Sequence, residues 1–215
     1  MQNESRARRG ALWGALWLVL FDASAAASLP LISEVFYDQA GSDDGHTFVE
    51  LYGPPGTSLG GLRLEAVNGF DGGVGPVVPL AGTIGPSGLF VVADRTGGGV
   101  TFVSVFDQLA NFDLQNGPDS VRLVSDGAVL DAVGYGDFDP TEVFAGEGVS
   151  APDPPAGSSL ARVFADLDTN DNAVDFTTLT SPTPGAAPLA TAVPEPSLPL
   201  LMYLGLVAWW WHGTR

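Results

Sequence analysis

Two strand-like runs joined by Asp126 and Gly127 constrain the fold more than any other part of the chain. Residues 120–125 and 128–133 are rich in β-branched and other apolar residues that alternate with polar ones, a pattern typical of a strand with one buried face. Asp-Gly favours a two-residue type I′ turn, which requires a positive φ at both central positions. The sequence therefore predicts an antiparallel hairpin over residues 120–133.

Further strand-like runs are spread along the chain between turn residues. They cover residues 31–37, 47–52, 62–67, 77–80, 88–93, 100–106, 157–163 and 175–179. The 28 glycines and 17 prolines supply the turns, and no stretch shows a sustained helical period. These features predict an all-β fold, a sandwich of about 7–9 short antiparallel strands.

Charge balance and missing residue types exclude several classes of function. Asp and Glu number 25 against 8 Lys and Arg, a net charge of −17. This balance disfavours nucleic acid as a partner, because phosphate binding depends on basic residues that replace counterions. The absence of cysteine excludes disulfides, thiolate metal sites and a cysteine nucleophile. The absence of lysine excludes Schiff-base and phosphate-loop chemistry.

Residues 1–27 are typical of a secretory signal peptide. Arg6, Arg8 and Arg9 precede an apolar run over residues 11–21, and small residues follow up to Ala27. We expect cleavage after Ala25 or Ala27. The apolar run is well below the roughly 20 residues that a spanning helix needs, so export is favoured over a permanent N-terminal anchor.

The last part of the chain carries a proline motif ahead of an apolar segment. A linker over residues 187–196 ends in the motif Val193, Pro194, Glu195 and Pro196. Residues 197–215 are an expected hydrophobic helix that ends in the basic residue Arg215. This order resembles the PEP-CTERM sorting signal of exported proteins from Gram-negative-type bacteria. The resemblance implies recognition by an exosortase, a membrane-embedded cysteine transpeptidase that cuts near the motif and removes the helix.

A second resemblance covers nearly all of the mature domain. It rests on segments in a fixed order, at residues 32–35, 48–52, 59–64, 121–124, 131–135, 159–162, 168–172, 175–176 and 183–185. Together they resemble the lamin-tail domain, an immunoglobulin-like β-sandwich found in exported bacterial proteins, where it is regarded as an envelope or extracellular binding module. We therefore expect an immunoglobulin-like sandwich over residues 28–186, flanked by the signal helix and the C-terminal hydrophobic helix.

One loop carries side-chain oxygens at the spacing that a hard cation requires. Its candidate Ca²⁺ ligands are Asp166, Asp168, Asn170 and Asp171. The loop fails as an EF-hand, because Asp171 stands where glycine is needed and Thr177 where the bidentate glutamate belongs. The alternative is that Asp and Asn hydrogen-bond the backbone to shape a turn. This alternative is favoured, and Ca²⁺ is kept as a candidate cofactor.

A second acidic loop follows the first predicted strand and contains Asp38, Asp43, Asp44 and His46. His46 is the only histidine of residues 28–196, which excludes a two-histidine site. We expect a solvated loop there. Glu34 and Glu50, on neighbouring predicted strands, are expected to point outward beside an arginine.

These observations predict a non-enzymatic exported module that acts in binding or structure. It is expected to be held transiently in the membrane by its C-terminal segment and then to reach the cell surface or the extracellular matrix. The expected partners are an exosortase-type transpeptidase, the secretion machinery, and exopolysaccharide or an envelope protein. Two alternatives stay open. A secreted Ca²⁺-dependent hydrolase requires that the two acidic loops converge in one cleft, and a Ca²⁺-stabilised adhesin requires stabilisation by Ca²⁺.

Overall fold

The computed structural model describes residues 29–190. This range contains the expected sandwich domain except Ser28, whereas the expected signal helix and C-terminal hydrophobic helix lie outside the described residues. Within residues 29–190, no helix is long and apolar enough to cross a membrane.

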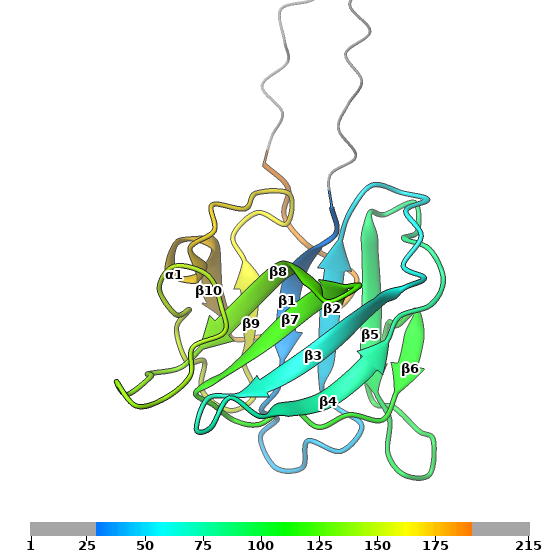
Figure 1. Ribbon diagram of the computed structural model, residues 1–215. Helices are drawn as coiled ribbons and strands as arrows, with labels where there is room; N and C mark the ends of the chain where they lie inside the picture. Colours follow the sequence, from blue (N-terminus) through cyan, green and yellow to red (C-terminus); the bar gives the residue numbers. More distant parts are fainter. Residues whose placement is uncertain (1–28, 191–215) are drawn as a thin grey trace, which may run out of the picture.

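Ten strands of the described residues form two sheets (Figure 1). The six-stranded sheet has the spatial order β10 (Phe176–Leu179), β9 (Ser159–Arg162), β1 (Leu31–Phe36), β2 (Phe48–Tyr52), β5 (Leu89–Asp94) and β6 (Gln108–Ala110). The four-stranded sheet has the order β4 (Val74–Pro79), β3 (Leu62–Asn68), β7 (Asp119–Ser125) and β8 (Ala128–Tyr135). All neighbours are antiparallel except β5 and β6, which are parallel. The all-β prediction is confirmed, with more strands than predicted.

The hairpin predicted around Asp126 and Gly127 is confirmed. β7 and β8 are antiparallel neighbours, and Ser125 pairs with Ala128 across the turn. Asp126 has φ +47° and Gly127 has φ +85°, the two positive values that a type I′ turn requires.

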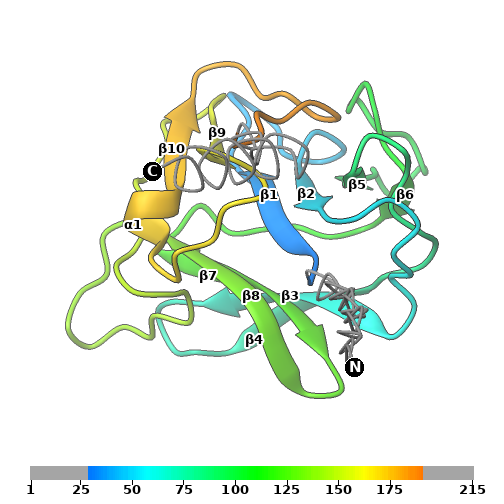
Figure 2. The same ribbon diagram turned by 90° about the horizontal axis from the view of Figure 1, so that it is seen from above.

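The core lies between the two sheets, to which alternate residues of the central strands contribute. Its fully buried members from the first sheet include Ile32, Val35, Val49, Leu51, Val92 and Leu160, and those from the second include Val121, Leu123 and Val133. The rings of Tyr37 and Tyr135 stack at a centroid distance of 4.1 Å where the layers meet. Figure 2, viewed along the layers, shows β1, β2, β5 and β9 on one side and β3, β4, β7 and β8 on the other.

The prediction of a strand over residues 100–106 is wrong. Three glycines precede this run, and its backbone bonds the loop after β1 instead of a strand: the Phe102 amide donates to the Gly45 carbonyl at 2.7 Å. Only Val103 is buried, in a small cluster with Phe36 and Phe48 on the outer face of the first sheet. The chain joins the sheet afterwards, as β6.

One short helix, α1 (Asn172–Asp175), was not predicted. Four residues are too few for a helical period to be visible in the sequence. The helix precedes β10, and its capping residue is Asp171. In Figure 1, the first described residues, in dark blue, and the last, in orange, lie at the same end of the sandwich.

Candidate functional site

A buried arginine organises the acidic side chains near the start of β1. Arg162, the last residue of β9, has a side chain that is 0% exposed. Its Nη2 donates to both carboxylate oxygens of Asp131 at 3.1 Å. Its Nη1 donates to Asp175 Oδ2 at 2.9 Å and to Asp168 Oδ1 at 3.3 Å, and its Nε donates to the Ile32 carbonyl at 3.1 Å. The planar guanidinium therefore ties β9 to β1, to β8 and to the segment around α1.

The four residues predicted as calcium ligands have separate roles. Asp166 Oδ1 accepts a hydrogen bond from the Ala190 amide at 2.7 Å. Asp168 Oδ1 accepts one from the Asn170 amide at 3.0 Å, and Asn170 itself has φ +57°. Asp171 Oδ1 accepts a hydrogen bond from the Ala173 amide at 3.2 Å and thereby caps α1. These bonds shape the turn, as in the favoured interpretation of this loop, while calcium binding stays a prediction.

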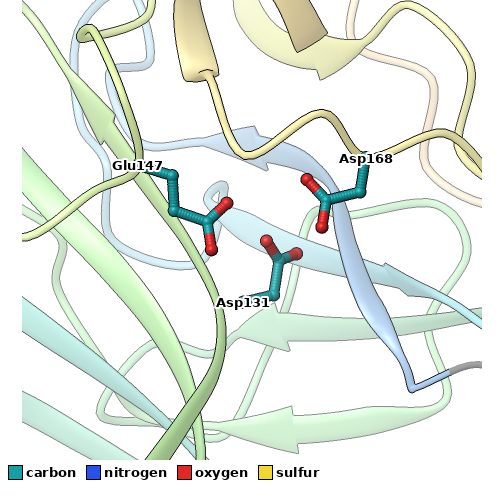
Figure 3. Close-up of side chains that lie close together, drawn as sticks. All are labelled: Asp131, Glu147 and Asp168. Carbon is teal, nitrogen blue, oxygen red and sulfur yellow. The ribbon is translucent and has the colours of Figure 1, made fainter.

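Asp168 also belongs to a cluster of carboxylates that the sequence did not indicate. One oxygen each from Asp131, Glu147 and Asp168 lie within 4.8 Å of one another. Figure 3 shows the three side chains pointing toward a common centre, with Asp131 on β8 and the other two on loops. Glu147 Oε2 is buried and has no hydrogen-bond partner among the described residues. Acidic oxygens this close repel one another unless a proton or a cation lies between them.

Burial raises the proton affinity of this cluster. Removal from water, with smaller contributions from the charges of Asp131 and Asp168, raises the pKa of Glu147 to about 7. Burial also raises the pKa of Asp131, although the Arg162 guanidinium works in the opposite direction. Counting Asp175, four carboxylates surround one guanidinium. The site therefore carries an excess of negative charge, which a proton on Glu147 or a hard cation can balance.

The donor set favours the proton over a cation. Ca²⁺ takes about 6–8 oxygen ligands, and both oxygens of Asp131 already accept bonds from Arg162. Asp168 Oδ1 accepts two further bonds. A cation would share these carboxylates with a positive guanidinium, whereas protonation of Glu147 lowers the repulsion without that competition.

The second acidic loop lies at the other end of β1. Asp131 and Arg162 both bond the backbone of Ile32, close to the start of the strand, whereas residues 38–46 follow its end. Figure 1 shows this loop in blue at the bottom, away from α1. The two acidic loops do not converge, so the single acidic cleft that the hydrolase alternative requires does not form.

The acidic side chains of that second loop face solvent and a shallow hollow. Asp43 and Asp44 line it together with Asp94 in a volume of about 360 Å³. The His46 ring stacks on Phe102 at 4.5 Å, and its Nδ1 lies 3.2 Å from the Asp44 carbonyl. These contacts are with a ring and a carbonyl, not with the hydroxyl that a nucleophilic triad requires.

The prediction that Glu34 and Glu50 point outward from the sandwich beside an arginine is right about the face of the sheet and wrong about the arginine. The two residues are directly opposed in the pairing of β1 with β2. They face the outer side of the first sheet, yet they are only 1% and 0% exposed. Within residues 29–190, neither forms a salt bridge with an arginine. A segment near the C-terminal end of the described chain covers both.

Sequence reasoning assigned no role to Arg162, Asp131 or Asp175. One signal was nevertheless present. Arg162 follows apolar residues in a short strand, and Asp131 stands inside the apolar run of β8. Charged residues at buried strand positions have to pair, so these two residues are natural partners once both strands are expected in one core.

The predicted sorting motif, Val193, Pro194, Glu195 and Pro196, lies outside the described residues, as does Arg215. The same holds for the predicted signal peptide over residues 1–27. Comparison with models of known protein families, with curated proteins and with solved structures gives no match.

Proposed function

We propose that this chain is an exported lamin-tail-like module with an immunoglobulin-like fold, sorted by an exosortase-type system to the cell surface or the extracellular polysaccharide matrix. The module acts in binding or structure and performs no catalysis of its own. Its ligand is matrix polysaccharide or an envelope protein.

The observation that carries this proposal is the arrangement at the C-terminal end of the sandwich. Hydrogen bonds within the folded domain extend as far as Ala190, whose amide donates to Asp166 Oδ1. Only two residues separate Ala190 from Val193, the first residue of the sorting motif. A folded domain followed directly by a processing motif and an apolar segment is the order that a sorted, membrane-held precursor requires.

The distribution of acidic residues supports a binding or structural role over the hydrolase alternative. The two acidic loops occupy opposite ends of β1, and the carboxylates of the first one mostly hold backbone amides or Arg162. General acid–base catalysis needs an acid and a base around one substrate position. The acidic excess of the full chain, a net charge of −17, favours solubility of the protein after export.

The proposal is tested by following the C-terminus in cells that contain an exosortase-type enzyme. The full chain is expected to lose its apolar segment and to leave the membrane fraction, which mass spectrometry of the purified protein detects. Glu195→Ala within the motif is expected to retain Arg215 and to stay with the membrane. Pro199→Ala, three residues beyond the motif, serves as the matched control. Retention of Arg215 by the unaltered chain overturns the proposal.

A second candidate function, a Ca²⁺-stabilised adhesive domain, is favoured by one observation. Glu147 Oε2 is buried next to Asp131 and Asp168 and has no hydrogen-bond partner within residues 29–190. If a cation binds there, thermal unfolding with Ca²⁺ at about 100 times its Kd shifts the melting temperature by about 5–10 °C relative to EDTA. Glu147→Gln removes that shift. Equal melting temperatures in Ca²⁺ and EDTA rule this candidate out.

A further inference from the structure

Residues 180–190, here called the strap, leave β10 and run across the outer face of the first sheet. No strand pairing holds this segment, because β10 ends at Leu179 and no later strand is present up to Ala190. The strap is held instead by hydrogen bonds to side chains and loops. Its contacts fall into two groups, one at the middle of the sheet and one near Ala190.

The middle of the strap is bonded to the two buried glutamates. The Thr183 amide donates to Glu34 Oε1 at 2.9 Å, and the Thr183 hydroxyl donates to Glu34 Oε2 at 2.8 Å. The Gly185 amide donates to Glu50 Oε2 at 2.7 Å. The remaining bonds to these carboxylates come from serine hydroxyls. Ser159 donates to Glu34, and Ser33, in β1, donates to Glu50. The strap thus supplies three of the donors that two buried, adjacent carboxylates need.

Gly185 fits this position for two reasons. Its φ of +85° lies in the left-handed region that glycine tolerates best. A Cβ atom there would lie 2.9 Å from Val105 Cγ1, in the loop between β5 and β6. The strap therefore passes close to this loop at Gly185. A side chain at that position would push the strap away from Glu50.

The end of the strap is bonded to the loop that follows β9. The Pro188 carbonyl accepts from the Ala165 amide at 2.8 Å, and the Ala190 amide donates to Asp166 Oδ1 at 2.7 Å. With the strap docked, two residues separate the last bonded amide from Val193, a reach of about 7 Å. With the strap released from Leu179, the spacer is 13 residues and reaches about 45 Å.

We propose that docking of the strap on Glu34 and Glu50 controls enzymatic access to the sorting motif, an inference that rests on the proposed function. An enzyme that cuts near Val193 has to accommodate the chain on both sides of the bond, which a docked strap prevents on its N-terminal side. Cleavage of a protected segment follows the population of its open form when opening and closing are fast. The strap therefore couples the rate of processing to the folded state of the sandwich, because Glu34 and Glu50 oppose each other only when β1 and β2 are paired.

Two variants weaken the strap and one serves as the control. Thr183→Val removes the hydroxyl donor and keeps the amide. Gly185→Ala introduces the contact with Val105 together with the strained φ. Gly56→Ala is matched to the latter, because Gly56 has φ +86° but no atom within 4 Å of its Cβ position.

The opening of the strap is measured by hydrogen exchange on the full chain in mild detergent. We expect slow exchange over residues 183–190 in the unaltered chain. Loss of one hydrogen bond that holds the strap is expected to raise the open population by up to about tenfold. Both strap variants should therefore exchange up to about tenfold faster in this segment, and Gly56→Ala should not. Exchange of this segment at the rate of an unstructured chain in the unaltered protein overturns the inference.

Two cleavage assays then distinguish opening of the strap from recognition of the sorting motif. Elastase, whose S1 pocket accepts small residues, is expected to cut after Ala190 or Ala192 up to about tenfold faster in the strap variants. Cleavage by the exosortase-type enzyme should rise by the same factor. If elastase cutting rises and exosortase-type cleavage occurs equally in all variants, control of sorting by the strap is refuted. If elastase cutting rises but the sorting enzyme cuts no form of the chain, the proposed function fails and, with it, the role of the strap in sorting.

Discussion

Replacing Arg162 with methionine tests whether this one side chain holds the acidic end of the sandwich together. The substitution keeps most of the apolar stem and removes the guanidinium, with its bonds to Asp131, Asp168 and Asp175 and to the Ile32 carbonyl. The contact between the guanidinium and the Phe176 ring, at 4.6 Å, is lost as well. What stays behind is a group of carboxylates without a counter-charge.

The expected loss of stability follows from the burial of those carboxylates. Removing one partner of a buried ion pair costs about 3–5 kcal/mol, because the other charge is left uncompensated. Two partners of Arg162 are buried, with Asp131 at 0% and Asp175 at 4% exposure. We therefore expect the upper part of that range, about 4–5 kcal/mol at pH 8. This is a large share of the total stability of a domain, about 5–15 kcal/mol.

The loss should shrink at lower pH. Burial already raises the pKa of Asp131, and without Arg162 the lowering contribution of the guanidinium disappears. The folded variant then binds a proton more tightly than the unfolded chain does, so its stability recovers as the pH falls toward 5. Urea unfolding at pH 8 and pH 5 measures the difference. Circular dichroism is the suitable probe, because the five tryptophans, at positions 13, 17, 209, 210 and 211, all lie outside residues 29–190.

Two further variants make the result decisive. Arg162→Lys keeps the charge but not the fork of donors, so it should lose less stability than methionine and stay measurable. Arg122→Met is the control, because the Arg122 side chain is 25% exposed and its partner Glu65 keeps a second arginine; it should cost less than about 1 kcal/mol. The reasoning is refuted if Arg162→Met lowers the free energy of unfolding no more than Arg122→Met does. It is also refuted if the loss for Arg162→Met is the same at pH 8 and pH 5.

Three other perturbations probe the core, the hairpin and the covered glutamates. Leu123→Ala, at a 0% exposed position, should cost about 2–5 kcal/mol in urea unfolding, whereas Val129→Ala, at 49% exposure, should cost less than about 0.5 kcal/mol; equal costs contradict the assigned core. Gly127→Ala, at φ +85° with no atom within 4 Å, should cost about 1–2 kcal/mol through backbone strain alone, and an unchanged stability argues against the type I′ turn. Burial raises the pKa of Glu50 from 4.5 to about 7, so its contribution to stability is present below pH 4.5 and lost as the pH rises through about 7. Glu50→Gln should make the melting temperature less dependent on pH between 4.5 and about 7. An unchanged dependence on pH contradicts the burial of Glu50.

The strands could be predicted where local chemistry determines them. In β7 and β8, the alternation of apolar and polar residues and the Asp126-Gly127 turn act between neighbouring residues, and both were confirmed. The same alternation misled the prediction for residues 100–106, because that run packs against the loop after β1 and only Val103 is buried there. A local pattern shows that a segment suits a strand, not that a partner strand lies beside it.

The acidic end of the sandwich shows the limit most clearly. Asp168 was predicted as a site residue from the spacing of oxygens in its own loop, yet its position beside Asp131 and Glu147 depends on contacts between strands far apart in the sequence. The bond between Asp131 and the Ile32 amide joins residues 99 positions apart, and the bond between Arg162 and the Ile32 carbonyl spans 130 positions.

By itself, the sequence determined the class of fold and the position of the main hairpin, because turn chemistry and hydrophobic alternation are local. Only the tertiary structure decided which charges meet. Glu34 and Glu50 were expected to point outward from their strands, and they are buried because the strap crosses them, 149 residues beyond Glu34 and 135 residues beyond Glu50. Spacing in the sequence does not encode such contacts, since they exist only after β1 and β2 have paired and the strap has crossed them.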